Sequence, residues 1–218
     1  MRGVRPTDLL AATEFVLGAL RPFAGRDWSV RAGSLDWDVA FTVAHVAGSM
    51  TKAATYLAAA ATTWSPLVIS ADPRATNDQL LDGVEVSARG LAFVAAHVEG
   101  STRGFHAWGM GDAAAFLARG ANEVLVHGWD VASGLDIAFD PPPQVCAPIV
   151  GRRFPWVADD VDPWTTLLTA EGRAGGEHWI PIEVPLGEWD GAAPAGAQRR
   201  AIAWARDAAT ARWVPTYP

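Results

Sequence analysis

The sequence has little cysteine, few charged residues and no long apolar run, and each shortage excludes a class of protein. Cys146 is the single cysteine among 218 residues, so neither a disulfide framework nor a cysteine-built zinc finger can form. No apolar run reaches the length of about eighteen residues that a membrane-spanning helix needs. Acidic residues outnumber basic ones by 24 to 17, and no basic cluster offsets the formal net charge of −7. We therefore expect no nucleic-acid partner, because binding a phosphate backbone requires such a cluster.

What the sequence does contain is typical of a folded domain. Half of its residues are hydrophobic and 19% are charged, which excludes wholesale disorder. Charged residues near the N-terminus leave no apolar core for a signal peptide. We expect a soluble, cytoplasmic protein that does not associate with membranes and whose partner is a small-molecule substrate.

Apolar residues recur at helical spacing in four long segments that have their own start or stop signals. The first helix is predicted to begin with a Thr7 cap, and the third with a capping box of Thr76 and Gln79. The fourth is predicted to begin at an Asp112 cap. The four predicted helices cover residues 7–21, 36–61, 76–99 and 112–133. Helices of this length joined by modest loops predict a mainly α fold, an antiparallel four-helix bundle over residues 1–140.

The pattern weakens after the bundle, and residues 141–218 are predicted to form a C-terminal extension of mixed structure. Its expected elements are short helices at 144–153 and 163–170, an extended piece at 179–184, a linker at 186–197 and a final helix at about 197–212. The extension either packs on the bundle or forms a small subdomain, and the sequence leaves both arrangements open.

Three polar residues form a stripe along the fourth predicted helix. Glu123 and His127 are four residues apart and lie on adjacent turns, with Asp130 on the same stripe. A carboxylate and an imidazole in this arrangement can ligate one divalent metal ion. The stripe could equally be the one solvated edge of an otherwise apolar helix, and on this helix alone the pattern favours that interpretation.

Two further histidines are candidates for the same site. His45, on the second predicted helix, is the candidate third ligand, but its helix face is mixed and could be partly solvated. His106 lies in a loop rich in glycine and aromatic residues, at 104–111, and could line the mouth of a pocket. An ordinary loop histidine is the simpler interpretation of His106. Periodicity does not separate these alternatives, because it does not show whether the two polar faces point at each other.

Three stretches of the sequence together resemble a known family. Residues 35–47 contain a tryptophan-led entry into a helix that carries His45, and residues 122–132 contain a Glu-x-x-x-His-x-x-Asp pattern. Residues 163–173 are similar, more weakly, to a Leu-Leu-x-x-Thr-Gly-Arg ending. On these stretches the chain resembles the DinB-like superfamily, and within it the N-terminal metal-binding domain of mycothiol-dependent maleylpyruvate isomerases.

The resemblance implies a DinB-like antiparallel four-helix bundle that holds a divalent metal ion, usually zinc, through His45, Glu123 and His127. In such proteins a low-molecular-weight thiol, mycothiol or a similar one, is thought to bind the open metal positions as a thiolate. Glu171 stands where many members have threonine, and residues 181–218 match no part of the pattern.

These observations lead to one main hypothesis and two alternatives. The main hypothesis is a metal-dependent, thiol-using isomerase or S-transferase that acts on a small electrophilic molecule. Asp130 would orient a ligand imidazole, Arg119 would contact an anionic substrate unless it is simply a surface arginine, and His106 would lie at the pocket mouth. The first alternative is a non-catalytic, metal-stabilised binding or regulatory module, which could be a homodimer that uses residues 181–218 as a contact arm. The second is a hydrolase in which the metal activates water.

Overall fold

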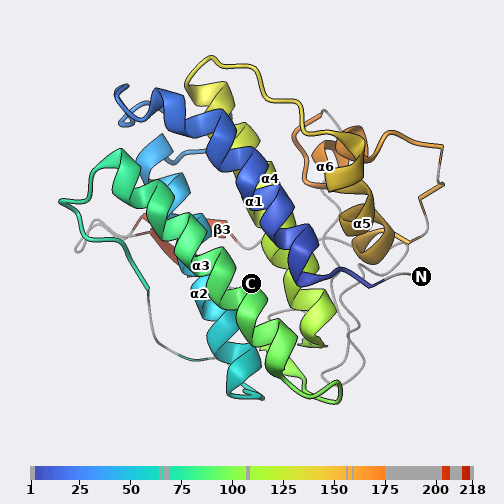
Figure 1. Ribbon diagram of the computed structural model, residues 1–218. Coiled ribbons are helices and arrows are strands. Elements are labelled where there is room, and N and C mark those ends of the chain that lie inside the picture. Colours follow the sequence, from blue (N-terminus) through green and yellow to red (C-terminus); the bar gives the residue numbers. More distant parts are fainter. Residues whose placement is uncertain are drawn as a thin grey trace.

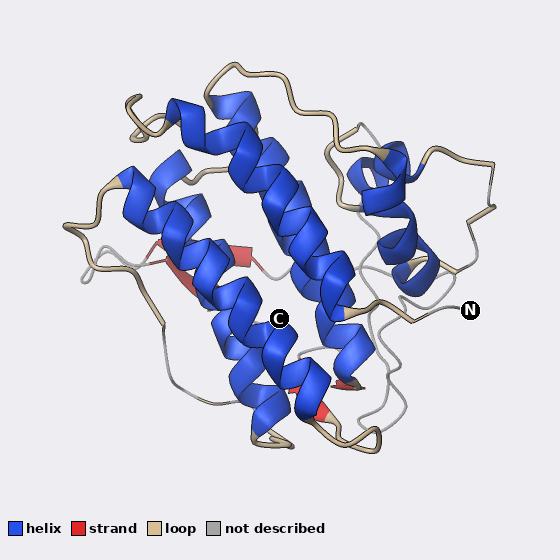
Figure 2. Ribbon diagram, viewed as in Figure 1, coloured by secondary structure: helices blue, strands red, loops and turns tan. Residues whose placement is uncertain are grey.

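The structure, a computed structural model, describes residues 3–174 with gaps at 64, 66–68, 107–108, 156 and 159, together with two strands beyond residue 200. The described part is mainly helical (Figures 1 and 2). Its long helices are α1 (Pro6–Leu20), α2 (Val39–Ala58), α3 (Asn77–His97) and α4 (Ala113–Gly134). Its shorter elements are the 3-10 turn η1 (Arg21–Phe23), the helices α5 (Pro143–Arg153) and α6 (Pro163–Ala170), and the strands β1 (Gly104–His106), β2 (Gly109–Gly111), β3 (Ala203–Arg206) and β4 (Trp213–Thr216).

Helices α2, α3 and α4 begin at side chains that accept a hydrogen bond from a backbone N–H group of the first turn. The Asp112 carboxylate accepts from the N–H of Ala115 at 2.8 Å, as the predicted cap requires. The predicted capping box at the start of α3 is also present, with the Thr76 N–H donating to the Gln79 side chain at 2.9 Å. The predicted Thr7 cap is wrong, because the N-cap is Arg5 and Thr7 lies inside α1, which begins at Pro6. Proline suits the first helical position, where its missing N–H would have no partner.

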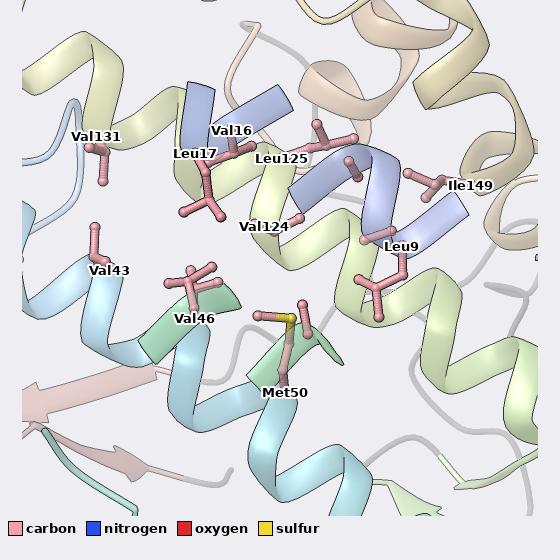
Figure 3. Close-up of a cluster of buried hydrophobic side chains, with 14 of the residues drawn as sticks. Leu9, Val16, Leu17, Val43, Val46, Met50, Val124, Leu125, Val131 and Ile149 are labelled. Carbon is pink, nitrogen blue, oxygen red and sulfur yellow. The ribbon is translucent and has the colours of Figure 1, made fainter. Parts of the chain in front are cut away.

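Helices α1 to α4 share one apolar core, and α4 runs through it. Helix α2 packs against α3 and α4, and α1 packs against α3 and α4. Figure 3 shows side chains from α1, α2, α4 and α5 meeting in the core, and those labelled are Leu9, Val16, Leu17, Val43, Val46, Met50, Val124, Leu125, Val131 and Ile149. Most residues of α4 are buried by the neighbouring helices, and these include the polar residues Asn122, Glu123 and Asp130.

The short helices α5 and α6 lie where the sequence predicts them, at 144–153 and 163–170 to within one residue. They pack against each other, and α5 also packs against α4 and α1 (Figure 1). Ile149 and Leu167 are fully buried, so the extension shares an apolar contact with the four long helices.

Two short hairpins differ from the predicted elements. The predicted loop at 104–111 contains the antiparallel pair β1 and β2, with Phe105 opposite Met110. The predicted final helix at 197–212 is wrong at its centre, because β3 is a strand paired antiparallel with β4. A four-residue segment is too short for its periodicity to select one conformation, so the pairing partner decides. The predicted extended piece at 179–184 and linker at 186–197 lie outside the described residues.

The loop before α2 lies against the C-terminal end of α4. A Cβ atom on Gly134 would overlap the backbone carbonyl oxygen of Arg31, so only glycine permits this approach. The contact brings residues 31–38 beside the helix that carries Glu123 and His127. Within the described ranges, every helix falls short of the length or the apolarity that a bilayer crossing requires.

Candidate metal centre

Helices α2 and α4 bring His45, Glu123 and His127 together. Oε2 of Glu123 lies 3.5 Å from Nε2 of His45 and 3.6 Å from Nε2 of His127. One ligand atom from each of the three residues lies within 4.8 Å of the other two. Glu123 is 7% exposed, and the histidine side chains are 16% and 13% exposed. The two polar faces therefore point at each other, and neither is a solvated edge.

The spacing of these atoms fits a divalent metal ion. Bonds of about 2.1 Å to a tetrahedral ion place neighbouring ligand atoms about 3.4 Å apart, close to the two separations from Glu123 Oε2. Glu123 Oε2 is buried, and among the described residues no donor lies in hydrogen-bonding geometry to it, since the two imidazole nitrogens stand 3.5 and 3.6 Å away. A buried carboxylate oxygen without a partner is costly, and a cation between the three side chains would satisfy it. Imidazole nitrogen and carboxylate oxygen are ligands that several divalent ions accept.

The second oxygen of Glu123 is held by Arg119. Nη2 of Arg119 lies 2.6 Å from Oε1 of Glu123, one helical turn away on α4. Burial acts to raise the pKa of Glu123, but Arg119, His45 and His127 more than offset it, so the pKa lies well below its ordinary value. Glu123 is therefore ionised, with Oε1 paired and Oε2 directed at the histidines. The structure places Arg119 against a candidate ligand, and its side chain is 22% exposed.

His127 is oriented through its other ring nitrogen. Nδ1 of His127 lies 2.9 Å from Oδ2 of Asp130, which is fully buried. Arg173 holds the same carboxylate with Nε 3.1 Å from Oδ1 and Nη2 2.8 Å from Oδ2. Burial acts to raise the pKa of Asp130, but hydrogen bonds from His127 and Arg173 outweigh it and lower the pKa. With Nδ1 donating to Asp130, Nε2 of His127 is the nitrogen left for a metal ion.

His45 contacts the aromatic rings of Trp37 and His127. The ring of Trp37, in the loop before α2, is centred 4.8 Å from the His45 ring and 5.9 Å from the His127 ring. The two imidazoles meet edge to face, 5.3 Å apart. Burial lowers the pKa of His45, although Glu123 opposes the shift. A neutral imidazole is the form that binds metal ions.

His106, the loop candidate, lies on β1 and is half-buried. Burial and the positive charge of Arg119 hold its pKa well below the ordinary value, so its imidazole is neutral. His106 is not one of the three residues whose ligand atoms converge.

A buried ion pair between Arg153 and Glu171 lies next to α4, to which Asn122 joins it. Nη1 of Arg153, on α5, lies 2.9 Å from Oε1 of Glu171, and Asn122 donates to the same oxygen at 2.8 Å. Arg153 is 3% exposed, so Glu171 supplies the negative charge that its burial requires. No spacing in the sequence points to Arg153 or Arg173, because the partner of each, Glu171 for Arg153 and Asp130 for Arg173, lies on another element. The only signal for Arg173 is its place at the end of the 163–173 stretch.

Comparison with known proteins supplies the family. The model of the mycothiol maleylpyruvate isomerase N-terminal domain family matches residues 9–132. No curated protein and no solved structure gave a match in the corresponding searches. The family match covers more than half of the chain, so the chain belongs to this family. The matched region contains His45, Glu123, His127 and Asp130 and ends before α5.

Proposed function

From the membership of this mycothiol-associated family and the geometry on α2 and α4, we propose that the protein is a metal-dependent enzyme that uses a low-molecular-weight thiol. His45, Glu123 and His127 hold one divalent ion, and Zn²⁺ is the ion that we propose. Mycothiol or a similar thiol is the cosubstrate. The proposal depends on one observation, the convergence of two imidazole nitrogens on a buried carboxylate oxygen that accepts no hydrogen bond from the described residues. In this proposal α1 to α4 form the DinB-like antiparallel four-helix bundle.

The ligand set suits the activation of a thiol. A divalent ion at this position lowers the pKa of a bound thiol and keeps it as a thiolate near neutral pH. His45 and His127 bring no charge as neutral imidazoles, and Glu123 brings one negative charge that it shares with Arg119 at Oε1. These residues therefore neutralise at most half of the charge of a divalent cation. Three protein ligands also leave room for an exogenous ligand, as in zinc enzymes.

The reaction class is an isomerisation or an S-transfer on a small electrophilic molecule. In both, the thiolate adds to an electron-poor carbon–carbon double bond, which becomes a single bond. In an isomerisation, rotation about this single bond and expulsion of the thiolate restore the double bond in the other geometry and return the thiol. In an S-transfer, the carbanion takes up a proton and the thioether leaves, so one thiol is consumed per turnover.

Metal content tests the site. The full chain is purified without an affinity tag, and bound metal is measured for the wild type, His127→Ala and His97→Ala. His97 is an exposed histidine near the end of α3 and controls for nonspecific imidazole binding. We expect one ion per chain in the wild type and in His97→Ala, and none in His127→Ala. Wild-type protein without metal, or His127→Ala with full metal content, would overturn the site.

Cobalt substitution tests the thiol. Titration of the Co²⁺ protein with mycothiol should add a thiolate-to-cobalt absorption band that saturates at one thiol per ion. Turnover of electron-poor alkenes should then require the thiol, and thiol consumption should distinguish S-transfer from isomerisation. A metal-loaded protein whose spectrum does not respond to mycothiol would contradict the proposed thiol role. Turnover without thiol would instead indicate activation of water.

A further inference from the structure

Arg173 reaches the candidate metal centre from outside the region that the family match covers. It follows α6, about forty residues beyond the end of the match, and its guanidinium contacts both oxygens of Asp130 on α4. We propose that Arg173 is a positioning residue for the metal centre, which fixes His127 through Asp130 so that Nε2 of the imidazole faces His45 and Glu123. This inference rests on the proposed metal site and adds the C-terminal extension to it.

The contacts on Asp130 leave its carboxylate little freedom. Arg173 Nε donates to Oδ1 at 3.1 Å and Nη2 donates to Oδ2 at 2.8 Å, so the planar guanidinium sets the plane of the carboxylate. Oδ2 also contacts Nδ1 of His127 at 2.9 Å. A carboxylate fixed in this way accepts the imidazole proton from one direction, which selects one tautomer and one ring orientation for His127. Asp130 is fully buried and the Arg173 side chain is 12% exposed, so water does not replace these contacts freely.

Local sequence explains why Arg173 points back at α4. The N–H of Arg173 donates to the carbonyl of Leu168 at 2.7 Å, and the N–H of Gly172 donates to the carbonyl of Thr169 at 3.0 Å. Gly172 has a φ of 71°, the left-handed conformation that glycine adopts without strain. This pair of bonds is the Schellman ending of a helix, and it reverses the chain after α6. Nη1 of Arg173 also donates to the carbonyl of Glu171 at 2.6 Å, so the guanidinium is fixed from its own side as well.

The neighbouring ion pair provides a matched comparison. Glu171 lies in the same turn, and its carboxylate pairs with Arg153 and Asn122 at 2.9 and 2.8 Å, whereas that of Asp130 pairs with Arg173 and His127. If Arg173 only fastened the turn to α4, weakening the Glu171 pair should affect the metal centre as much as weakening the Arg173 pair. A positioning role predicts that only the Arg173 pair affects it.

The experiment measures zinc affinity by competition with a chelator for the wild type, Arg173→Met, Arg173→Lys and Glu171→Gln, all as full chains. Loss of a residue that orients a metal ligand typically weakens binding about 10- to 100-fold. We expect about this loss in Arg173→Met and about tenfold in Arg173→Lys, which keeps the charge but loses the two-pronged contact. We expect an unchanged affinity in Glu171→Gln. In metal-free protein, ¹⁵N-histidine NMR should show a single Nδ1-protonated tautomer for His127 in the wild type and a mixture in Arg173→Met.

The outcomes separate this inference from the proposed function. Wild-type zinc affinity and an unchanged His127 tautomer in Arg173→Met would overturn the positioning role, while loss of metal in His127→Ala would still support the site. An equal loss of affinity in Glu171→Gln would also overturn it, in favour of a fastening role. If Arg173→Met does not fold, Arg173→Lys decides, and wild-type affinity in that variant would contradict the inference. Full metal content in His127→Ala would instead overturn the proposed function.

Discussion

Two buried carboxylates on α4, about two turns apart, have opposite environments. Both oxygens of Asp130 are occupied, by Arg173 and His127 at 2.8 to 3.1 Å. Glu123 is also buried, but only Oε1 is paired, with Arg119, and Oε2 accepts no hydrogen bond from the described residues. Burial of a charged group is tolerated when its hydrogen-bonding capacity is filled. Asp130, whose oxygens are both hydrogen-bonded, therefore orients His127. Glu123, whose Oε2 lacks a hydrogen bond from the described residues, is the candidate for binding a cation.

The largest loss of stability is expected for Asp130→Asn in metal-free protein. This change keeps the shape of the side chain, but the nearly buried Arg173 loses its negatively charged partner. We expect the free energy of unfolding to fall by about 3–5 kcal/mol, the usual cost of removing one partner of a buried ion pair. Urea unfolding measures this value. Asp82→Asn, in an exposed pair with Arg21, is the control and should cost about 0.5 kcal/mol or less. A similar small cost for Asp130→Asn would break the comparison.

Metal removal is expected to have the next largest effect, and it acts through Glu123. Zinc at one hundred times its dissociation constant should raise the free energy of unfolding of the wild type by about 2.7 kcal/mol, and a chelator should remove this gain. Glu123→Gln and His127→Ala should gain little from the same zinc concentration. Thermal unfolding with and without the chelator measures the difference. An equal gain in His127→Ala would show that zinc binds elsewhere.

Glu171 provides an intermediate case, since its Oε1 accepts from both Arg153 and Asn122. Glu171→Gln keeps an acceptor oxygen and loses the charge, so each hydrogen bond weakens without being lost. We expect a destabilisation of about 1–2 kcal/mol in urea unfolding, between the values for Asp130 and Glu123. A loss as large as that of Asp130→Asn would mean that the charge of each carboxylate, and not the number of its hydrogen-bond partners, determines how much it stabilises the fold.

The smallest effect is expected for Glu123→Gln in the absence of metal. The amide can present its oxygen to Arg119, and the atom in place of Oε2 has no hydrogen bond from the described residues to lose. We expect the free energy of unfolding to change by less than about 1 kcal/mol. The same urea experiment tests this, and a large loss would show that the charge of Glu123, through Arg119 or at Oε2, already stabilises the metal-free protein.

Local signals in the sequence predicted the helical elements well. The capping residues Thr76 and Asp112 mark the starts of α3 and α4, because a cap bonds to N–H groups within three residues of itself. The short helices α5 and α6 were also predicted from local pattern. The prediction failed for residues 197–212, where β3 pairs with β4. A strand is stabilised by the strand that it pairs with, which lies outside the segment itself, so the pattern of that segment alone does not determine it.

By itself, the sequence determined that Glu123 and His127 share one face of α4, because a helix places residues four apart on adjacent turns. The tertiary structure alone decided that His45 meets this face and that Arg173 reaches Asp130 behind it. The rotation of each helix about its own axis is set by how its apolar side chains pack against its neighbours, and that packing involves residues far apart in the chain. Helical periodicity predicts which residues share a polar face on α2 or on α4, and the packing of the core decides that these two faces meet.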